Sequence, residues 1–260
     1  MFASEDRLSW FGYKFGQSGA HSARSMMLAE LVVLFSATRP DCSQKQYQED
    51  ICDYNVLDKP TTKSRTLTFR HLVDLYGMDC SIPLFRVFRK LWSLDPSAQP
   101  VLAIQMSLAR DPLLRLTLPL IKELNTGASV IRQDVEEILK APDPERFSPA
   151  SLKSFAQNIN GSWTQAGFLA GRNKKARSEP TVTPVNIAFA LFLAYLEGAT
   201  GERLLQSSHC KIFGLTGHQL NELAIAAGHR GLIDFKQSGG VTDIRFTDYL
   251  TQEEEAWLYE

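Results

Sequence analysis

The sequence has few cysteines and no excess of either charge. Its four cysteines include no Cys-x-x-Cys pair, which excludes a zinc ribbon and a disulfide scaffold and fits reduced thiols in the cytoplasm. Basic residues number 28 and acidic residues 29, so the protein as a whole offers no positive field to nucleic acid. Any electrostatic function must therefore depend on local clusters of charge.

Long apolar runs and a secretory leader are also absent. The first residues, MFASEDRLSWFGYKFG, carry acidic residues early and contain no apolar segment of the kind a signal peptide needs. The longest uncharged apolar stretch covers residues 185–196, which is shorter than the roughly 20 residues of a membrane-spanning helix. We therefore expect a soluble, cytoplasmic protein that has no contact with a membrane.

Signatures of catalysis and metal binding are missing as well. No GxSxG elbow, GxxxxGKS loop or GxGxxG motif follows a predicted strand. The nearest approach to a metal cluster is His209, Cys210 and His218, which lack a fourth donor at the usual spacing. The sequence therefore predicts a protein that is not an enzyme and that holds neither a metal nor a cofactor.

The dominant pattern that is present is helical. Apolar residues recur every three to four positions, which predicts helices over residues 25–37, 47–56, 61–76, 84–94, 101–110, 113–124, 133–140, 184–197 and 216–227. Only residues 232–236 and 241–246 alternate with period two, around Gly239-Gly240. We therefore expect a mainly α-helical fold with one β-hairpin and essentially no strand before residue 230.

The segment APDPERF, residues 141–147, contains two prolines and is the best candidate for a linker. It predicts two domains, an amino-terminal helical bundle over residues 1–142 and a helix-turn-helix or winged-helix-like domain over residues 147–260. In a winged helix, the helix ending near Gly228 would be the recognition helix and the terminal hairpin the wing. The alternative is that the hairpin only covers a helical core.

One part of the chain is strongly basic. From Arg146 to Arg177 there are six basic residues and no acidic one. Residues 149–158 and 162–169 around Asn160-Gly161 suggest a helix-turn-helix, followed by a basic loop. Cations bind phosphates, and amides can read base edges. The predicted DNA contacts in this part are Lys153, Gln165, Arg172, Lys174, Lys175 and Arg177. A solvated basic loop is the alternative interpretation.

A second basic stretch covers residues 59–90. It holds seven cations against Asp74 and Asp79, a net charge of +5 by count. The predicted DNA contacts here are Lys63, Arg65, Arg70, Arg86 and Arg89, and the four arginines are expected to share one face. A polar helix face that is basic by chance explains the same count.

Three segments, in this order, resemble a known family. They are YNVLDKPTTKSRTLTFRHLVDLYG (residues 54–77), VLAIQMSLARDPLLR (101–115) and FSPASLKSFAQNINGSWTQAGFL (147–169). The chain resembles the BrxA family of the BREX phage-exclusion systems over residues 22–171. The resemblance implies an amino-terminal bundle similar to the transcription antitermination factor NusB and a winged-helix-like carboxy-terminal part. It also implies DNA binding in bacterial antiviral defence.

The sequence therefore predicts a non-catalytic component of a BREX-type defence system that binds double-stranded DNA. Its expected partners are double-stranded DNA and other proteins of the defence system. Two alternatives stay open. One is a protein-interaction scaffold within a defence complex, and the other is a transcription regulator that uses the winged helix.

Overall fold

The computed structural model describes residues 4–172 and 174–259 of the 260-residue chain. More than half of these residues are helical, and the strands among them form one sheet of three strands and one of two. The expected mainly α-helical fold with a β-hairpin is confirmed. No helix in the described ranges is long and apolar enough to cross a membrane.

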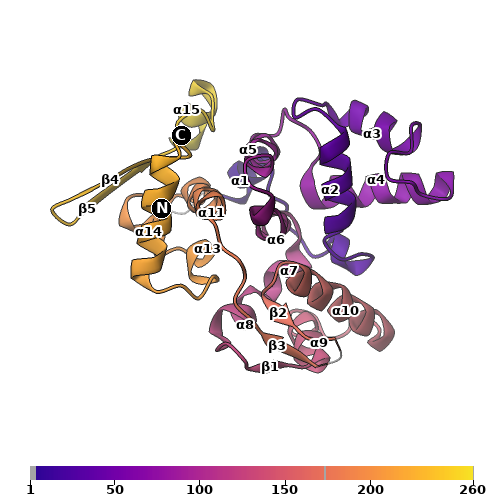
Figure 1. Cartoon of the computed structure of the whole chain (residues 1–260). Helices are drawn as coiled ribbons and strands as arrows, with labels where there is room; N and C mark the ends of the chain where they lie inside the picture. The colour runs from indigo at the N-terminus through magenta and orange to yellow at the C-terminus, as the bar shows by residue number, and fades with distance from the viewer. Residues whose placement is uncertain (1–3, 173, 260) are drawn as a thin grey trace.

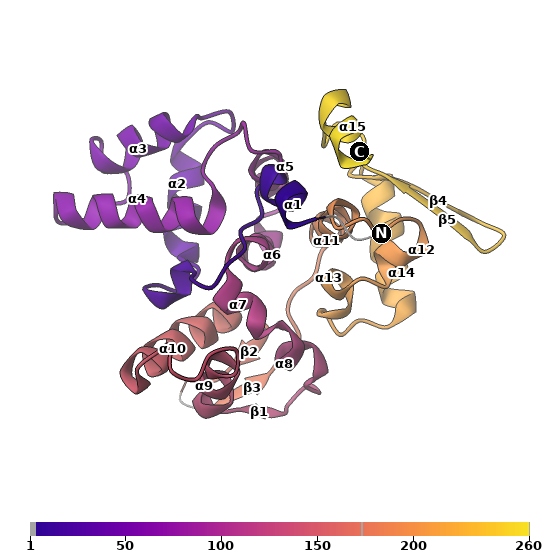
Figure 2. The same ribbon diagram turned by 180° about the vertical axis from the view of Figure 1, so that it is seen from behind.

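The helices form three groups around a central helix, α6 (Gln99–Arg110), as Figures 1 and 2 show. The first group contains α2 (Leu28–Ala37), α3 (Gln44–Cys52) and α4 (Thr62–Tyr76). The second contains α7 (Pro112–Leu116), α8 (Leu118–Glu123), α9 (Arg132–Lys140), α10 (Pro149–Gln165) and the larger sheet. The third contains α11 (Pro184–Leu196), α12 (Glu202–Leu205), α13 (Ser208–Lys211), α14 (Gly217–His229), the terminal hairpin and α15 (Gln252–Tyr259). Helices α1 (Glu5–Phe11) and α5 (Pro83–Trp92) lie near α6.

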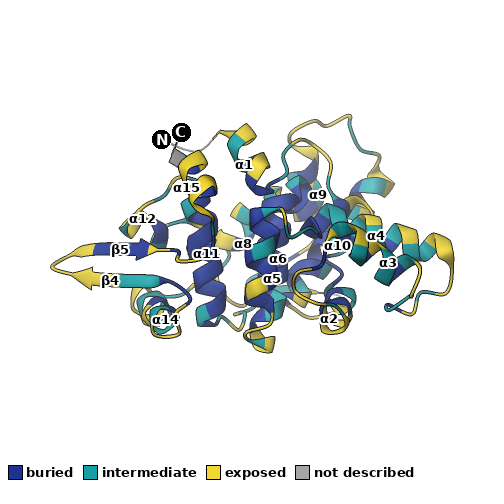
Figure 3. Ribbon diagram, turned by 90° about the horizontal axis from the view of Figure 1, so that it is seen from above, coloured by how far each residue is buried: buried dark blue, intermediate teal, exposed yellow. Residues whose placement is uncertain are grey.

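The core is centred on α6 and α11. Every residue from 101 to 110 is buried, and so are most residues of α11. A helix that is apolar on all sides is stable only when other elements surround it. Helix α6 packs against α4, α5, α10 and α11, and Figure 3 shows α6 and α11 as the dark centre of the molecule. The longest apolar stretch of the sequence is therefore a core helix.

Several helices begin where the sequence predicts, because polar side chains cap their first turns. At the start of α4, Thr61 Oγ1 accepts from the Ser64 amide at 3.1 Å, and Ser64 Oγ accepts from the Thr61 amide at 3.2 Å. Thr216 and Gln219 make the same reciprocal pair at the start of α14. These bonds satisfy amides that a helix leaves without an internal partner. The helix expected over residues 216–227 is confirmed and begins at this cap.

Helix α10 differs from the expected helix-turn-helix. It is one continuous helix that runs through Asn160-Gly161, where a turn was predicted. Asn and Gly each disfavour a helix interior by about 1 kcal/mol or less. The helix completely buries Trp163, whose Nε1 donates to Thr117 Oγ1 at 2.9 Å. Tertiary packing therefore overrides the local preference for a turn.

A small antiparallel sheet lies in a part of the chain where no strand was expected. Its strand order is β1 (Ser129–Val130), β3 (Lys175–Arg177) and β2 (Leu169–Ala170). Strands β2 and β3 form a hairpin with Ala170 opposite Ala176. The last residues of the expected basic loop therefore belong to a strand. Strands of two or three residues are too short to leave an alternating pattern in the sequence.

The proline-rich segment 141–147 connects two helices that pack against each other. Helix α9 precedes it, α10 follows it, and the two are in contact. Strand β1 also pairs with β3 across this segment, with Val130 opposite Lys175. The expected boundary between 1–142 and 147–260 is therefore crossed by contacts between α9 and α10 and between β1 and β3. The division into two domains stays a prediction.

The carboxy-terminal hairpin forms where the sequence predicts it. Strands β4 (Asp234–Ser238) and β5 (Val241–Arg245) pair with Ser238 opposite Val241. Between them, Gly239 and Gly240 have φ angles of +57° and +82°, which a two-residue hairpin turn requires and glycine adopts without strain. The hairpin follows α13 and α14, packs against α14 and projects from the molecule (Figure 3). This is the order of elements expected of a winged helix.

Candidate nucleic-acid interface

Arg89, one of the predicted DNA contacts, is an internal residue. Its side chain is buried, and the residue as a whole is only 2% exposed. Arg89 Nη2 donates to the carbonyl oxygens of Phe35 and Thr38 at 3.0 and 2.9 Å. These carbonyls end α2, where a positive charge is favourable. A phosphate group cannot reach this guanidinium, so the prediction that Arg89 contacts DNA is wrong.

Arg177 is internal as well. It is 5% exposed, its Nε donates to the Ile121 carbonyl at 3.2 Å, and its Nη2 donates to the Ile212 carbonyl at 2.9 Å. Burial lowers the pKa of the guanidinium. Arg177 therefore joins the end of α8 to the end of α13 and is not available to DNA.

Arg65 and Arg86 are half-buried and have internal partners. Arg86 Nη2 lies 2.5 Å from Glu254 Oε2, and Arg65 Nη1 donates to the Cys52 carbonyl at 3.2 Å. The single face expected for Arg65, Arg70, Arg86 and Arg89 is therefore not formed. Of the four arginines, only Arg70 is exposed.

The other predicted contacts lie at the surface. Lys63, Arg70, Lys153, Gln165, Arg172 and Lys174 are exposed, and Lys175 is partly exposed. Within residues 4–172 and 174–259, none of these cations forms a salt bridge. Their charges are therefore not neutralised by the described acidic residues, and they remain candidates for contact with a polyanion.

A loop that has no charge signal in the sequence packs against both basic parts of the chain. The short 3₁₀ helix η1 (Ala20–Ser22) packs against both α10 and α4. Gln165 on α10 donates to Ser25 Oγ at 3.4 Å. On the other side, burial and then the charge of Arg24 lower the pKa of the His71 imidazole on α4, and Arg70 adds to this effect. Arg24 is exposed and follows η1 by two residues, so it belongs to a loop that packs against both α4 and α10.

The exposed cations and amides of α4, the η1 loop, α10 and the β2–β3 hairpin are termed the basic surface. Its members are Arg24, Lys63, Arg70, Lys153, Gln157, Gln165, Arg172, Lys174 and Lys175. Two neighbouring acids are paired with other cations, Asp74 with Lys14 at 2.8 Å and Glu136 with Arg132 at 2.5 Å. The basic surface therefore keeps a positive balance. Arg24 was missed because a single arginine in a neutral segment gives no charge signal.

Gly171 sets the path of the chain between β2 and β3. Its φ angle is +101°, and a Cβ there would lie 2.1 Å from the Lys174 carbonyl oxygen. Only glycine fits such a position. Lys175 Nζ donates to the Gly171 carbonyl at 2.6 Å. Arg172, Lys174 and Lys175 are therefore held close together by the backbone.

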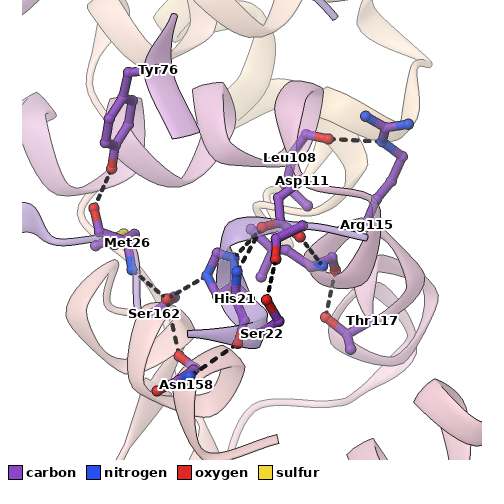
Figure 4. A network of polar contacts seen from close by, with 12 residues as sticks. His21, Ser22, Met26, Tyr76, Leu108, Asp111, Arg115, Thr117, Asn158 and Ser162 are labelled. Atoms are coloured by element: carbon purple, nitrogen blue, oxygen red, sulfur yellow. Dashed lines mark hydrogen bonds and ion pairs between the residues drawn. The ribbon is translucent and has the colours of Figure 1, made fainter. Parts of the chain in front are cut away.

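A buried network underlies the basic surface, and Figure 4 shows the His21 imidazole at its centre, between Asp111 and Ser162. His21 Nδ1 lies 2.9 Å from Asp111 Oδ2, and His21 Nε2 lies 2.7 Å from Ser162 Oγ. These contacts follow the order of a Ser-His-Asp hydrolase triad. All three residues, however, have an exposed fraction of 0%, so no substrate can reach the hydroxyl, and the network is structural.

Further hydrogen bonds anchor this network to three elements. Ser162 Oγ on α10 accepts from the Met26 amide at 2.8 Å. Asp111 accepts from the His21 amide at 2.9 Å and, as the cap of α7, from the Leu114 amide at 3.0 Å. Burial alone would raise the pKa of Asp111, but the hydrogen bonds and charge of His21 outweigh it and lower that pKa. The network therefore fixes the η1 loop, and with it Arg24, against α10.

The carboxy-terminal hairpin carries cations that are paired within it. Lys236 lies 3.2 Å from Asp234, and Arg245 lies 3.0 Å from Asp243, so each cation of the hairpin strands has an acidic partner. On α14, His218 lies 3.5 Å from Glu222. A polyanion would therefore be attracted more strongly to the basic surface than to the strands of the hairpin.

No family model and no curated protein matches the sequence. Among solved structures, the chain is similar to a crystal structure of a protein named SspB. The TM-score is 0.56, the likeness covers 96% of this chain and 95% of the other, and 10% of the aligned residues are identical. A likeness at this level concerns the fold alone. The resemblance to the BrxA family stays a prediction.

Proposed function

We propose that this chain is a non-catalytic, double-stranded-DNA-binding component of a phage-defence system of the BREX type, and a member of the BrxA family. The observation that carries the proposal is the packing of the η1 loop, which is followed by the exposed Arg24, against both α4 and α10 of the two basic parts of the chain. Arg70 contributes from α4, and Lys153 and Gln165 contribute from α10. The part from Arg146 to Arg177 contains no acidic residue that would repel phosphates.

The composition of the basic surface favours binding that tolerates many sequences. Lysine and arginine side chains neutralise phosphates and release condensed counterions, which gives affinity without base recognition. Gln157 and Gln165 are exposed amides on α10, and amides of this kind can contact base edges. We therefore expect similar affinities for unrelated duplexes, with a steep dependence on salt.

The test is a mobility-shift titration of a random-sequence duplex at several salt concentrations. Replacing Arg24 and Arg70 by glutamine removes two exposed cations, one that follows η1 and one on α4. The slope of log affinity against log salt should then become shallower by about 2. A matched control replaces Lys211 and Lys236, which are exposed in the winged-helix part, and should leave the slope unchanged.

The opposite result would identify a different interface. The slope could instead become shallower on replacement of Lys211 and Lys236 and stay unchanged on replacement of Arg24 and Arg70. The winged-helix regulator would then be the better interpretation. If the parent protein binds no duplex at low salt, the DNA-binding proposal fails.

One observation favours the scaffold as a second candidate. Trp10 and Trp257 are 49% and 42% exposed, and their ring centroids lie 6.0 Å apart where α1 and α15 meet. Exposed tryptophans of this kind are common at the centre of protein–protein interfaces. Replacing both by alanine should leave DNA binding unchanged and weaken capture of a partner from the same defence system.

A further inference from the structure

A polar pocket opens within the basic surface between α10 and the β2–β3 hairpin. Its volume is about 450 Å³, which lies in the range of small-molecule sites. Its lining includes three cations and two amides, Arg132, Arg172, Lys175, Gln157 and Asn160. None of its lining residues in the described chain is aromatic, so it lacks the ring on which a nucleobase would stack.

The charges of the pocket favour an anion with more than one negative charge. Arg132 forms an ion pair with Glu136, whose Oε1 lies 2.5 Å from Arg132 Nε. Arg172 and Lys175 have no acidic partner among the described residues, which leaves a balance of about two positive charges. Guanidinium groups bind phosphate oxygens through paired N–H donors, and lysine adds a point charge.

Asn160 is a buried polar residue of the pocket lining. It lines the pocket although it is only 7% exposed, and its Oδ1 has no hydrogen-bond partner in the described part of the chain. A buried amide atom without a partner is unfavourable by about 1–3 kcal/mol. An amide oxygen only accepts hydrogen bonds, and so do the oxygens of a phosphate dianion. The partner that Asn160 Oδ1 lacks would therefore have to be an N–H or O–H donor and not the phosphate.

Gly161 leaves the helix side of the pocket open. Glycine in a helix interior is unfavourable relative to alanine. A Cβ at this position would meet only Ser25 Cβ, at 3.8 Å, which is an ordinary contact. The packing of the protein therefore does not require glycine at this position. A ligand group that approaches the helix backbone from the pocket would require it.

We propose that this pocket binds a phosphate monoester, presented either by the 5′ end of a DNA strand or by a free mononucleotide. A monoester carries a charge of about −1.5 to −2 and three acceptor oxygens, which match the two unpaired cations of the pocket, Arg172 and Lys175. An internal phosphodiester carries a single charge and has chain on both sides, so it suits an open groove better than a pocket. The DNA-end form of this proposal rests on the proposed DNA-binding function, whereas the mononucleotide form does not.

The test compares two blunt duplexes that differ only in a 5′-phosphate or a 5′-hydroxyl at their ends. The phosphorylated duplex should bind about tenfold more tightly, because it gains charge-assisted hydrogen bonds. Adenosine 5′-monophosphate should compete with this preference, and adenosine should not. Direct titration of the full chain with adenosine 5′-monophosphate measures the pocket without DNA.

Variants separate the pocket from general attraction by charge. The Arg172→Gln/Lys175→Gln protein should lose the tenfold preference and the nucleotide binding. The Lys174→Gln protein changes the same turn outside the pocket lining and should keep both. Equal affinity for the two ends, without competition by the nucleotide, would overturn the pocket but leave duplex binding intact. Nucleotide binding without duplex binding would support the pocket and overturn the proposed function.

Discussion

The Nε2 atom of His21 lies 2.7 Å from the hydroxyl oxygen of Ser162, 141 residues later in the chain. This contact, together with the contact between His21 and Asp111, fixes the η1 loop against α10. Arg24 follows η1 by two residues. Its position in the basic surface therefore depends on a network of buried residues that do not belong to that surface. The basic surface is thus assembled by internal hydrogen bonds.

Replacement of Ser162 by alanine should destabilise the protein. It leaves the Met26 amide and one ring nitrogen of His21 without their partner in a buried site, and each loss costs about 1–3 kcal/mol. The free energy of unfolding, measured with urea, should fall by about 2–4 kcal/mol. Ser154→Ala, at an exposed position of the same helix, should change it by no more than about 0.5 kcal/mol. Equal values for the two variants would show that the network adds no stability.

Stability should decrease in acid partly through Asp111. Its carboxylate has a lowered pKa in the folded state, compared with about 3.9 in an unfolded chain. A group with a lowered folded pKa stabilises the protein above its unfolded pKa, and this stabilisation is lost as the pH falls through the folded pKa. Urea titrations at several pH values should therefore show that, below about pH 4, the free energy of unfolding falls more steeply for the parent than for Asp111→Asn. Parallel curves would contradict this assignment.

Arg89 and Arg70 should respond differently to the same substitution. Arg89→Gln removes two charge-assisted bonds at the end of α2 and should lower the free energy of unfolding by at least about 2 kcal/mol. Arg70→Gln, on the surface, should change stability by no more than about 0.5 kcal/mol and should instead weaken duplex binding. Thermal melting and mobility shifts of both variants test this pair. A stable Arg89→Gln protein that has lost DNA affinity would restore the original prediction.

The helical part of the fold could be predicted because its signals are local. Apolar spacing and polar caps such as Thr61 and Thr216 act within a few residues of each helix start. The terminal hairpin was predicted for the same reason, since Gly239-Gly240 adopts the turn directly. The β1–β3 pairing could not be predicted, because it joins Val130 to Lys175 through strands too short to show a pattern.

The candidate site was only partly predictable, because counts of charge do not separate surface cations from internal ones. Arg89 lies at helical spacing from Phe85 and Trp92, an apolar face, and this signal could have indicated burial. Arg177 gave no comparable signal, since its partners are carbonyls distant in the sequence. The network that positions Arg24 joins residues far apart in the chain, and no local pattern records it.

The most direct test of the central claim is the salt dependence of duplex binding for the Lys174→Gln/Lys175→Gln protein. Each lysine that neutralises a phosphate releases counterions, so the slope of log affinity against log salt should be shallower by about 2 than that of the parent. The loss should be similar for unrelated sequences, because phosphate contacts carry no base information. Equal affinity and slope for variant and parent would contradict DNA binding by the basic surface.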